Sequence, residues 1–280
     1  MRGLRLINCN APRWLACVAA IILSVQLTAC SPAARFERAA QSVDLIREDI
    51  TVNNLPLVIF RDEIAANSSS IHFYIDGDGS PWIGGKKVAT DPTTRSKLIL
   101  ELMRADKQAK ILIGRPCYYL SARQRPSVCS NALWTSDRYS EQVVQAMRTL
   151  IAQQINRYAP KRVTLIGYSG GGTLATLIAN DLTAVDVLVT IAANLDVDAW
   201  IKQHGYSPLS RSINAGNFPR LPSKIKQFHF VGESDQNVPS AITKSVAVNQ
   251  VNARVIEVPG YSHECCWPKT WASALAELVD

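Results

Sequence analysis

The chain has 280 residues, of which 47% are hydrophobic, and a formal net charge of +7. This content is enough for one large buried core, and single α/β domains often reach about 200–250 residues, so one main domain is the simplest organisation. No run of lysines and arginines interleaved with aromatic residues occurs, which argues against nucleic-acid binding.

The first segment has the pattern of a secretory leader. Arg2, Arg5 and Arg13 supply a positive start, and the apolar stretch that follows over 14–27 is short for a transmembrane helix. Positions 27–30 read Leu-Thr-Ala-Cys, which resembles the lipobox of bacterial lipoproteins. The resemblance implies a signal peptide over 1–29 and lipidation of Cys30, which would anchor the protein to a membrane. The alternatives are an ordinary signal peptide or an uncleaved anchor that happens to carry a cysteine at this position.

The residue after that cysteine bears on location. Ser31 is typical, by the same resemblance, of lipoproteins sorted to the outer membrane. We therefore expect a lipid-anchored protein of the cell envelope, on the outer membrane and facing the periplasm. The charge of +7 includes three leader arginines and no leader acids, so the processed chain would carry an ordinary +4.

Residues 30–49 have a helix-like pattern of alternating charge, and we expect a membrane-proximal linker there, followed by the main domain over 50–280. Four cysteines remain beyond the lipobox, and an even number in an exported chain suggests disulfides. Cys117 and Cys129 flank a polar loop and are the favoured pair. Cys265 and Cys266 could form a vicinal disulfide, stay reduced or exchange with the first pair. The spacing does not fit a zinc site.

Short β-rich runs recur along the main domain, at 57–60, 71–75, 111–113, 162–166, 185–191, 227–231 and 254–258. Helical patterns lie between several of them. Asp91 and Pro92 have the composition of a helix start, and Ser140 can cap a second helix whose apolar residues share one face. This alternation predicts a mostly parallel central sheet with helices on both faces. The irregular segment over 196–224 contains three aromatic residues and is expected to form a small lid or pocket wall.

The sequence Gly-Tyr-Ser-Gly-Gly over 167–171 fits the pattern G-x-S-x-G. It follows an apolar β-branched run and precedes small apolar residues, so it predicts a strand, a sharp turn and a helix with Ser169 at the turn. A nucleophilic serine on such a turn needs glycine neighbours, and the N–H of Gly170 at the helix start would face a developing oxyanion. A glycine-rich turn that merely packs tightly is the alternative.

A serine hydroxyl is a poor nucleophile without a base, and the chain has four histidines. His72 and His229 lie inside strand-like runs, where we expect buried core residues. His204 precedes a glycine in the irregular segment, where we expect a surface loop. His263 lies on the loop after the last predicted strand and is the candidate base.

Residues 50–280 therefore resemble an α/β-hydrolase of the serine hydrolase type, which implies the α/β-hydrolase fold with a small lid segment. The resemblance implies Ser169 as nucleophile, Asp235 as acid and His263 as base, in the chain order of that superfamily. Asp235 belongs to the pattern G-x-x-D-x-x-V-P over 232–239, which resembles the superfamily's acid loop, and Asp196 and Asp198 are alternative acids. The stretches "DGDGSPW", "GRPCYYL", "WTSDRYSE" and "HECCW" also resemble uncharacterised bacterial exported hydrolases, which implies no substrate.

The stretch "FYIDGDGSPW" resembles the His-Gly-x-Gly signature of the oxyanion loop, with Asp76 in the place of histidine. The resemblance implies that the backbone N–H groups of Asp78 and Gly170 form the oxyanion hole. Asp76, Asp78 and Ser80 also have the spacing of the first three ligands in a calcium-binding EF-hand loop. That interpretation fails because later positions lack the required glycine and glutamate, so we predict no metal site.

The expected activity is that of a carboxylesterase-like serine hydrolase, which cleaves an ester, thioester or amide of a small acyl substrate through an acyl-enzyme. No metal or organic cofactor is implied. An acyltransferase with the same three residues and a non-catalytic envelope lipoprotein on a hydrolase scaffold are the alternatives.

Overall fold

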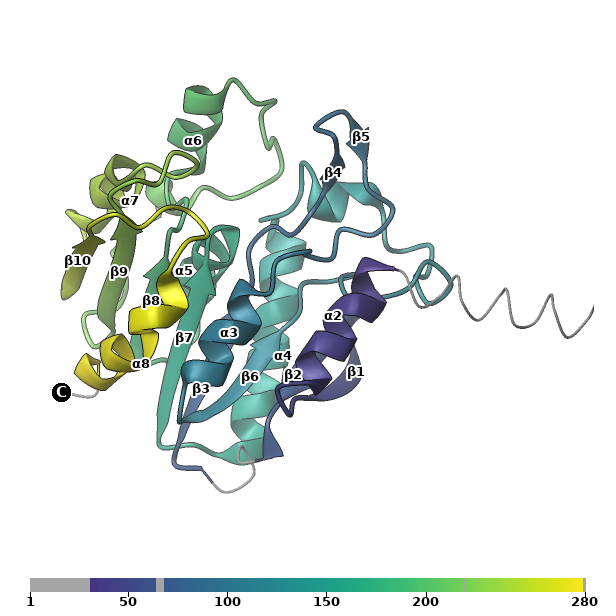
Figure 1. The fold of residues 1–280 in the computed structure, drawn as a ribbon, viewed down its shortest axis with the longest axis horizontal. Helices are drawn as coiled ribbons and strands as arrows, with labels where there is room; N and C mark the ends of the chain where they lie inside the picture. Colours follow the sequence, from purple (N-terminus) through teal and green to yellow (C-terminus); the bar gives the residue numbers. More distant parts are fainter. Residues whose placement is uncertain (1–30, 64–67, 219, 279–280) are drawn as a thin grey trace, which may run out of the picture.

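A computed structural model of the chain describes residues 31–63, 68–218 and 220–278. The predicted signal peptide and Cys30 lie outside them. In this part of the chain, eight strands form one sheet in the order β1-β2-β6-β3-β7-β8-β9-β10 (Figure 1). These strands are β1 (Ile46–Val52), β2 (Leu55–Arg61), β3 (Ser70–Ile75), β6 (Ala109–Ile113), β7 (Arg162–Tyr168), β8 (Val187–Ile191), β9 (Lys226–Gly232) and β10 (Ala253–Val258). A separate hairpin is formed by β4 (Trp82–Ile83) and β5 (Lys87–Val88).

The sheet is mostly parallel, as predicted. Neighbouring strands are parallel along the run β6-β3-β7-β8-β9-β10. The antiparallel pairs are β1 with β2 and β2 with β6. The register places Ile75 opposite Gly167 and Tyr168 opposite Ile191, so the carboxyl ends of β3, β7 and β8 meet at one edge. Each of the seven predicted β-rich runs coincides with a strand of this sheet.

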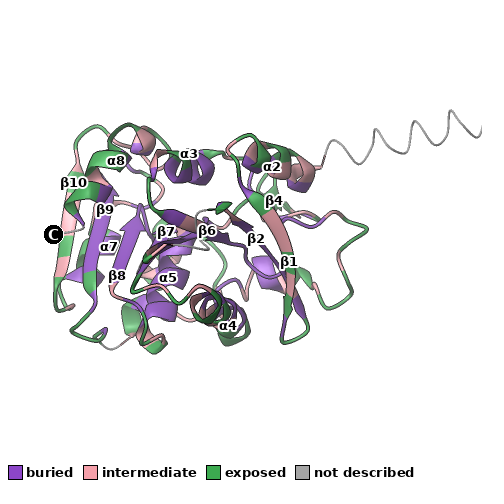
Figure 2. Ribbon diagram, turned by 90° about the horizontal axis from the view of Figure 1, so that it is seen from below, coloured by how far each residue is buried: buried purple, intermediate pink, exposed green. Residues whose placement is uncertain are grey.

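Helices cover both faces of the sheet, which confirms the predicted layers. Figure 2 shows α2, α3 and α8 on one face and α4 and α5 on the other. The helices are α2 (Pro32–Gln41), α3 (Leu98–Ala105), α4 (Glu141–Tyr158), α5 (Gly170–Asp181), α6 (Val197–His204), α7 (Ser240–Ala247) and α8 (Trp267–Glu277), with short 3₁₀ turns at Asn131–Trp134 and Ala215–Asn217. None of the helices in the described ranges combines the length and apolar content that crossing a bilayer requires.

The two predicted helix starts have different outcomes. Ser140 caps α4 by accepting a hydrogen bond from the Val143 N–H, as predicted. The helix expected from Asp91 is wrong, because α3 begins at Leu98. The Asp91 carboxylate does accept from the Thr93 N–H, but the backbone carbonyl of Pro92 accepts from Ser80 instead of starting a helix. A local cap signal is overridden here by contacts with another loop.

The segment expected to be a linker is part of the main domain where the structure describes it. Phe36 of α2 is buried, with its ring 5.3 Å from Phe60 and 4.5 Å from Tyr119. Residues 46–52 form β1, an edge strand whose Glu48 carboxylate pairs with Arg61 of β2. The domain therefore begins before residue 50, because the apolar face of α2 needs the core to cover it.

Two disulfides are present. Cys117 and Cys129 are joined, as predicted, and close a loop with a Cα–Cα distance of 5.7 Å. Cys265 and Cys266 form a vicinal disulfide, one of the three arrangements that the sequence left open. This second disulfide lies at the start of α8.

Candidate active site

Ser169 lies on a sharp turn between β7 and α5, where the sequence predicts it. Its φ of 51° and ψ of −126° are rare for a residue with a side chain. A side-chain atom added to Gly167 would collide with the backbone of Gly171, and one added to Gly171 would collide with the Ile75 carbonyl. The close approach of α5 to the strand ends therefore requires glycine at both positions, and it places Ser169 at the carboxyl edge of the sheet.

His263 and Asp235 contact this serine in series. His263 Nε2 lies 3.1 Å from Ser169 Oγ, and His263 Nδ1 lies 2.8 Å from Asp235 Oδ2. The side chain of Asp235 is fully buried, and its Oδ1 accepts hydrogen bonds from the backbone N–H groups of Asn237 and Val238. These two bonds orient the carboxylate, which leaves Oδ2 to accept the Nδ1–H of His263 and Nε2 to accept the serine proton.

The alternative acids are engaged elsewhere. Asp196 caps α6 by accepting a hydrogen bond from the Ala199 N–H at 3.0 Å. The side-chain amide of Asn214 donates to both Asp196 and Asp198. The structure thus places Asp235, and neither of these residues, against His263.

The other three histidines lie apart from the nucleophile. His72 and His229 are buried, as predicted, each with a ring nitrogen within hydrogen-bond distance of a polar side chain. The prediction that His204 lies on a surface loop is wrong. It is the last residue of α6, and its Nε2 donates to the Asn237 carbonyl at 2.7 Å. This contact ties α6 to the loop that carries the acid.

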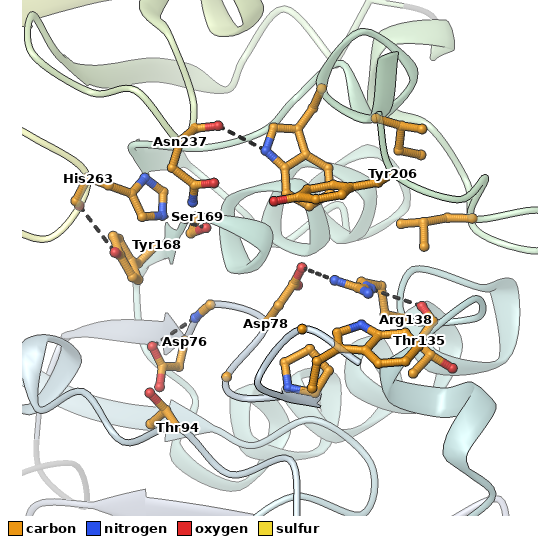
Figure 3. Close-up of a pocket in the computed structure, with 18 of the residues that line it drawn as sticks. Asp76, Asp78, Thr94, Thr135, Arg138, Tyr168, Ser169, Tyr206, Asn237 and His263 are labelled. Atoms are coloured by element: carbon orange, nitrogen blue, oxygen red, sulfur yellow. Dashed lines mark hydrogen bonds and ion pairs between the residues drawn. The ribbon is translucent and has the colours of Figure 1, made fainter. Parts of the chain in front are cut away.

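A cavity of about 700 Å³ opens beside Ser169 (Figure 3). Its walls come from the loops after β3, β9 and β10 and from the segment around α6. The indole N–H of Trp200 donates to the Asn237 carbonyl at 3.0 Å and holds α6 over the cavity. The segment expected to be a small lid or pocket wall is therefore a wall of this cavity, lined by Trp200, Ile201, Tyr206, Ser207, Pro208 and Leu209.

Asp78 and Gly170, which the sequence suggests as backbone donors, lie side by side, and Asp78 lines the cavity. Gly170 is the first residue of α5, and the first N–H groups of a helix have no partner within it. A side-chain atom on Gly170 would collide with Asp78 Oδ1. The loop after β3 can therefore approach the start of α5 only because Gly170 has no side chain.

Two arginines that the sequence did not identify hold this loop. Arg115 Nη2 and Arg138 Nη1 donate to the two carboxylate oxygens of Asp78 at 2.8 and 2.7 Å, and the Tyr139 hydroxyl contacts both oxygens. Burial alone raises the pKa of Asp78, but the charges of Arg138 and Arg115 outweigh it and hold that pKa below its ordinary value. The guanidinium carbon of Arg115 lies over the rings of Tyr118 and Tyr139, 5.9 and 5.6 Å from their centroids.

Asp76 lies in the same loop without a direct arginine contact in the described structure. Its Oδ1 accepts a hydrogen bond from the Gly77 N–H at 2.8 Å. Burial raises its pKa from 3.8 to about 6, and the Gly77 bond, the charge of Arg115 and a hydrogen bond from Tyr119 offset only part of this rise. The loop therefore contains one aspartate that is firmly ionised and one whose ionisation burial opposes.

The backbone of His263 is held by two aromatic side chains. The Tyr168 hydroxyl donates to the His263 carbonyl at 3.1 Å, and the Trp267 indole N–H donates to it at 3.0 Å. Burial, followed by the negative charge of nearby carboxylates, raises the pKa of Tyr168, so this hydroxyl remains a donor at neutral pH. The vicinal disulfide of Cys265 and Cys266 follows in the chain after one intervening residue.

Among residues 31–63, 68–218 and 220–278, no three His, Cys, Asp or Glu side chains are grouped so as to hold a metal ion. The chemistry available at the cavity is that of a hydroxyl, an imidazole, a carboxylate and backbone N–H groups.

The fold and the turn at Ser169 define a class of protein. A mostly parallel sheet covered by helices, with a serine on a strained turn after a central strand, is typical of serine hydrolases with the α/β-hydrolase fold. The chain matches the family model described as "Serine hydrolase (FSH1)" over residues 119–263, which is more than half of its length. It belongs to this family, which confirms the predicted superfamily and the predicted class of enzyme. The matched range includes Ser169, Asp235 and His263.

Solved structures share the fold at low sequence identity. The esterase Pf2001 of Pyrococcus furiosus superposes with a TM-score of 0.59 at 13% identity, over 85% of this chain and 93% of that chain. Est1E of Butyrivibrio proteoclasticus gives a TM-score of 0.57 at 13% identity, over 83% and 97%. A membrane phospholipase A, described as a bacterial virulence factor, gives 0.60 at 14% identity, over 96% and 98%. None of the curated proteins matches the chain. These likenesses show the α/β-hydrolase fold.

Proposed function

We propose that this serine hydrolase is a carboxylesterase-like enzyme in which Ser169 is the nucleophile, His263 the general base and Asp235 the acid. The observation that carries the proposal is the unbroken series of contacts, 3.1 Å from Ser169 Oγ to His263 Nε2 and 2.8 Å from His263 Nδ1 to Asp235 Oδ2. These distances lie within the range for proton transfer from a nucleophile to its base. An ester is favoured because Pf2001, one of the proteins that share the fold, is named an esterase.

The reaction would proceed in two steps. His263 Nε2 takes the proton of Ser169 as Oγ attacks the acyl carbonyl carbon, and the same proton then passes to the departing alcohol. Water, deprotonated by His263, releases the acid from the acyl-enzyme. Asp235 stays ionised and stabilises the imidazolium through the bond to Nδ1. The hydrogen bonds from Tyr168 and Trp267 to the His263 carbonyl keep the ring in place during both proton transfers.

The oxyanion would form between the start of α5 and the loop after β3. The Gly170 N–H is the first donor, because it lies at a helix start and directly follows the nucleophile. The Asp78 N–H is the second donor, and the ion pairs from Arg115 and Arg138 to the Asp78 carboxylate fix the loop before substrate arrives. Such preorganised donors contribute about 3–4 kcal/mol to transition-state stabilisation.

A fluorophosphonate probe tests the assignment. The wild-type protein should gain one adduct by intact mass, Ser169→Ala should gain none, and His263→Ala should react far more slowly. Ser212→Ala is a matched control, since this serine hydroxyl bonds to the Ser136 carbonyl away from His263, and it should label like wild type. A folded wild-type protein that forms no adduct would refute the nucleophile. Product analysis with an added alcohol would reveal an acyltransferase as a transferred ester in place of the free acid.

We also propose that the enzyme acts in the cell envelope, attached through lipidated Cys30 and facing the periplasm from the outer membrane. The support is the leader sequence that ends in Leu-Thr-Ala-Cys and the serine that follows it. An alkyne analogue of palmitate fed to the producing bacterium should label the wild-type protein but not Cys30→Ala. Equal labelling of both proteins, or of neither, would refute this attachment.

A further inference from the structure

An exposed apolar hairpin stands at the mouth of the cavity. Strands β4 and β5 pair with Trp82 opposite Val88 and Ile83 opposite Lys87, and we call residues 82–88 the mouth hairpin. Trp82 is 42% exposed and Ile83 48% exposed, unusual values for large apolar side chains that are adjacent in sequence. Figure 1 shows the hairpin projecting from the body of the protein near the carboxyl ends of the strands.

The tip of the mouth hairpin has space around it and carries positive charge. Gly84 and Gly85 have φ values of 57° and 70°, and a side-chain atom added to either would meet nothing within 4 Å. The next two residues, Lys86 and Lys87, are exposed. The tip therefore presents an aromatic and an aliphatic side chain directly beside two ammonium groups.

The mouth hairpin is continuous with the candidate active site. Trp82 and Gly85 line the same cavity as Ser169. Tyr206 lines it as well, from the segment after α6, and is 51% exposed. A surface that contacted these aromatic side chains would therefore lie across the entrance through which a substrate reaches the nucleophile.

Further positive charge surrounds a neighbouring hollow of about 250 Å³. Its lining includes the exposed residues Arg35, Arg95 and Lys97, which we call the basic rim. Thr94 and Ser96 line both this hollow and the active-site cavity, so the basic rim adjoins the cavity. Helix α2, which contributes Arg35, begins at Pro32, two residues after the proposed lipid anchor. The end of the chain that would be tethered therefore lies on the same side as the entrance.

We propose that the mouth hairpin and the basic rim dock on an anionic phospholipid bilayer, and that the enzyme takes fatty acyl esters of membrane lipids from it. The substrate part rests on the function proposed above. Tryptophan side chains favour the interface between hydrocarbon and headgroups, and lysine and arginine near such a surface are attracted to anionic lipids. A protein partner would not require the apolar tip, the cations and the chain end to lie at the same entrance, whereas a bilayer contacts all three at once.

The test uses the full-length chain, expressed with its leader, purified in its processed form and reconstituted into vesicles that contain brominated phosphatidylcholine. One set is phosphatidylcholine alone, and the other is equal parts phosphatidylcholine and phosphatidylglycerol. The fluorescence of Trp82 is taken as the difference between wild type and Trp82→Phe. We expect the brominated chains to quench it strongly in the anionic vesicles and weakly in the neutral ones.

A combined variant, Ile83→Ser with Lys86→Gln and Lys87→Gln, should lose this quenching, because each lysine removed weakens attraction to the anionic surface about fivefold. It should keep wild-type hydrolysis of a soluble short-chain ester, yet release fatty acid from phosphatidylglycerol at least about tenfold more slowly. The matched control is Val248→Ser, which removes an apolar side chain that is 79% exposed on the end of α7 and should behave as wild type.

The outcomes separate the two proposals. Absence of Trp82 quenching in anionic vesicles, or equal quenching in neutral ones, would overturn the docking surface while soluble-ester hydrolysis still supported the enzyme. Quenching without a fluorophosphonate adduct would support docking and overturn the proposed catalytic function. Quenching and soluble-ester hydrolysis without release of fatty acid from the bilayer would overturn the lipid substrate.

Discussion

Asp76→Asn should stabilise the protein at neutral and alkaline pH. Asp76 is buried within the candidate oxyanion loop, and its pKa is raised from 3.8 to about 6, mainly by burial. The unfolded chain releases this proton near pH 4, whereas the folded protein releases it only near pH 6. Across that interval the folded state binds more protons, so wild-type stability falls as the pH rises. Asparagine has no proton to lose and keeps an oxygen to accept the Gly77 N–H. The Tyr119 hydroxyl, which hydrogen-bonds to the carboxylate in wild type, can rotate to accept from the new amide.

The magnitude follows from the size of the shift. A rise from 3.8 to about 6, at about 1.4 kcal/mol for each pKa unit, is about 3 kcal/mol of stability forfeited by wild type above pH 6. Asp76→Asn should recover up to this amount at about pH 8 and none at about pH 4. The difference between the two pH values is diagnostic, because changes in packing act equally at both.

Urea denaturation of both proteins at the two pH values measures this difference. Asp181→Asn is the control for the loss of one carboxylate, because Asp181 is 43% exposed and pairs with Arg148 on the surface. Surface ion pairs contribute at most about 1 kcal/mol, so this control should change little. A gain for Asp76→Asn that is the same at both pH values, or no gain at the higher pH, would show that burial of the charged carboxylate is not the cause.

Three further outcomes are expected. Arg138→Gln should lower kcat for a soluble ester by up to about 100-fold with little change in KM, because Asp78 then loses one of its two ion pairs. Steady-state kinetics would measure this loss, and Arg138→Lys should restore part of the activity. His229→Gln should lose less stability than wild type on acidification from about pH 7 to about pH 5. Burial lowers the pKa of His229 to about 4, so in this range the unfolded wild-type chain takes up a proton that the folded protein does not. The same loss of unfolding free energy on acidification in the two proteins would contradict this prediction. Opening the Cys117–Cys129 disulfide by replacing both residues with serine should cost about 3 kcal/mol of unfolding free energy, and thermal melts that coincide with wild type would argue against it.

The strands and the position of the nucleophile could be predicted because local sequence determines them. A short apolar β-branched run favours a strand of a covered sheet, and each predicted run lies in a strand here, although β2 pairs antiparallel with both of its neighbours. The turn at Ser169 was predictable because its geometry tolerates few residues other than glycine at 167 and 171. Asp235 and His263 followed from a resemblance in chain order, and the structure brings both into contact with Ser169.

The helix start at Asp91 and the linker over 30–49 failed for a different reason. Both predictions used short polar signals, and such signals are weak when a larger apolar surface competes. Phe36 packs against the core and holds α2 in place, although four of the ten residues of that helix are charged or polar. Strand β1 is an edge strand with one mostly exposed face, so its sequence lacks the apolar run that identified the others.

The arginine contacts to Asp78 lay beyond prediction from local pattern, because 37 and 60 residues separate the partners along the chain. Arg115 and Arg138 occur in the stretches "GRPCYYL" and "WTSDRYSE", which were distinctive in sequence before any function could be assigned to them. Each arginine alone would be a costly buried charge, and Asp78 alone would be a costly buried carboxylate. Only the folded sheet, which brings the ends of β3 and β6 together ahead of α4, joins them. The charged residues that fix the candidate oxyanion loop can thus be buried without a large desolvation cost only when they are paired with one another.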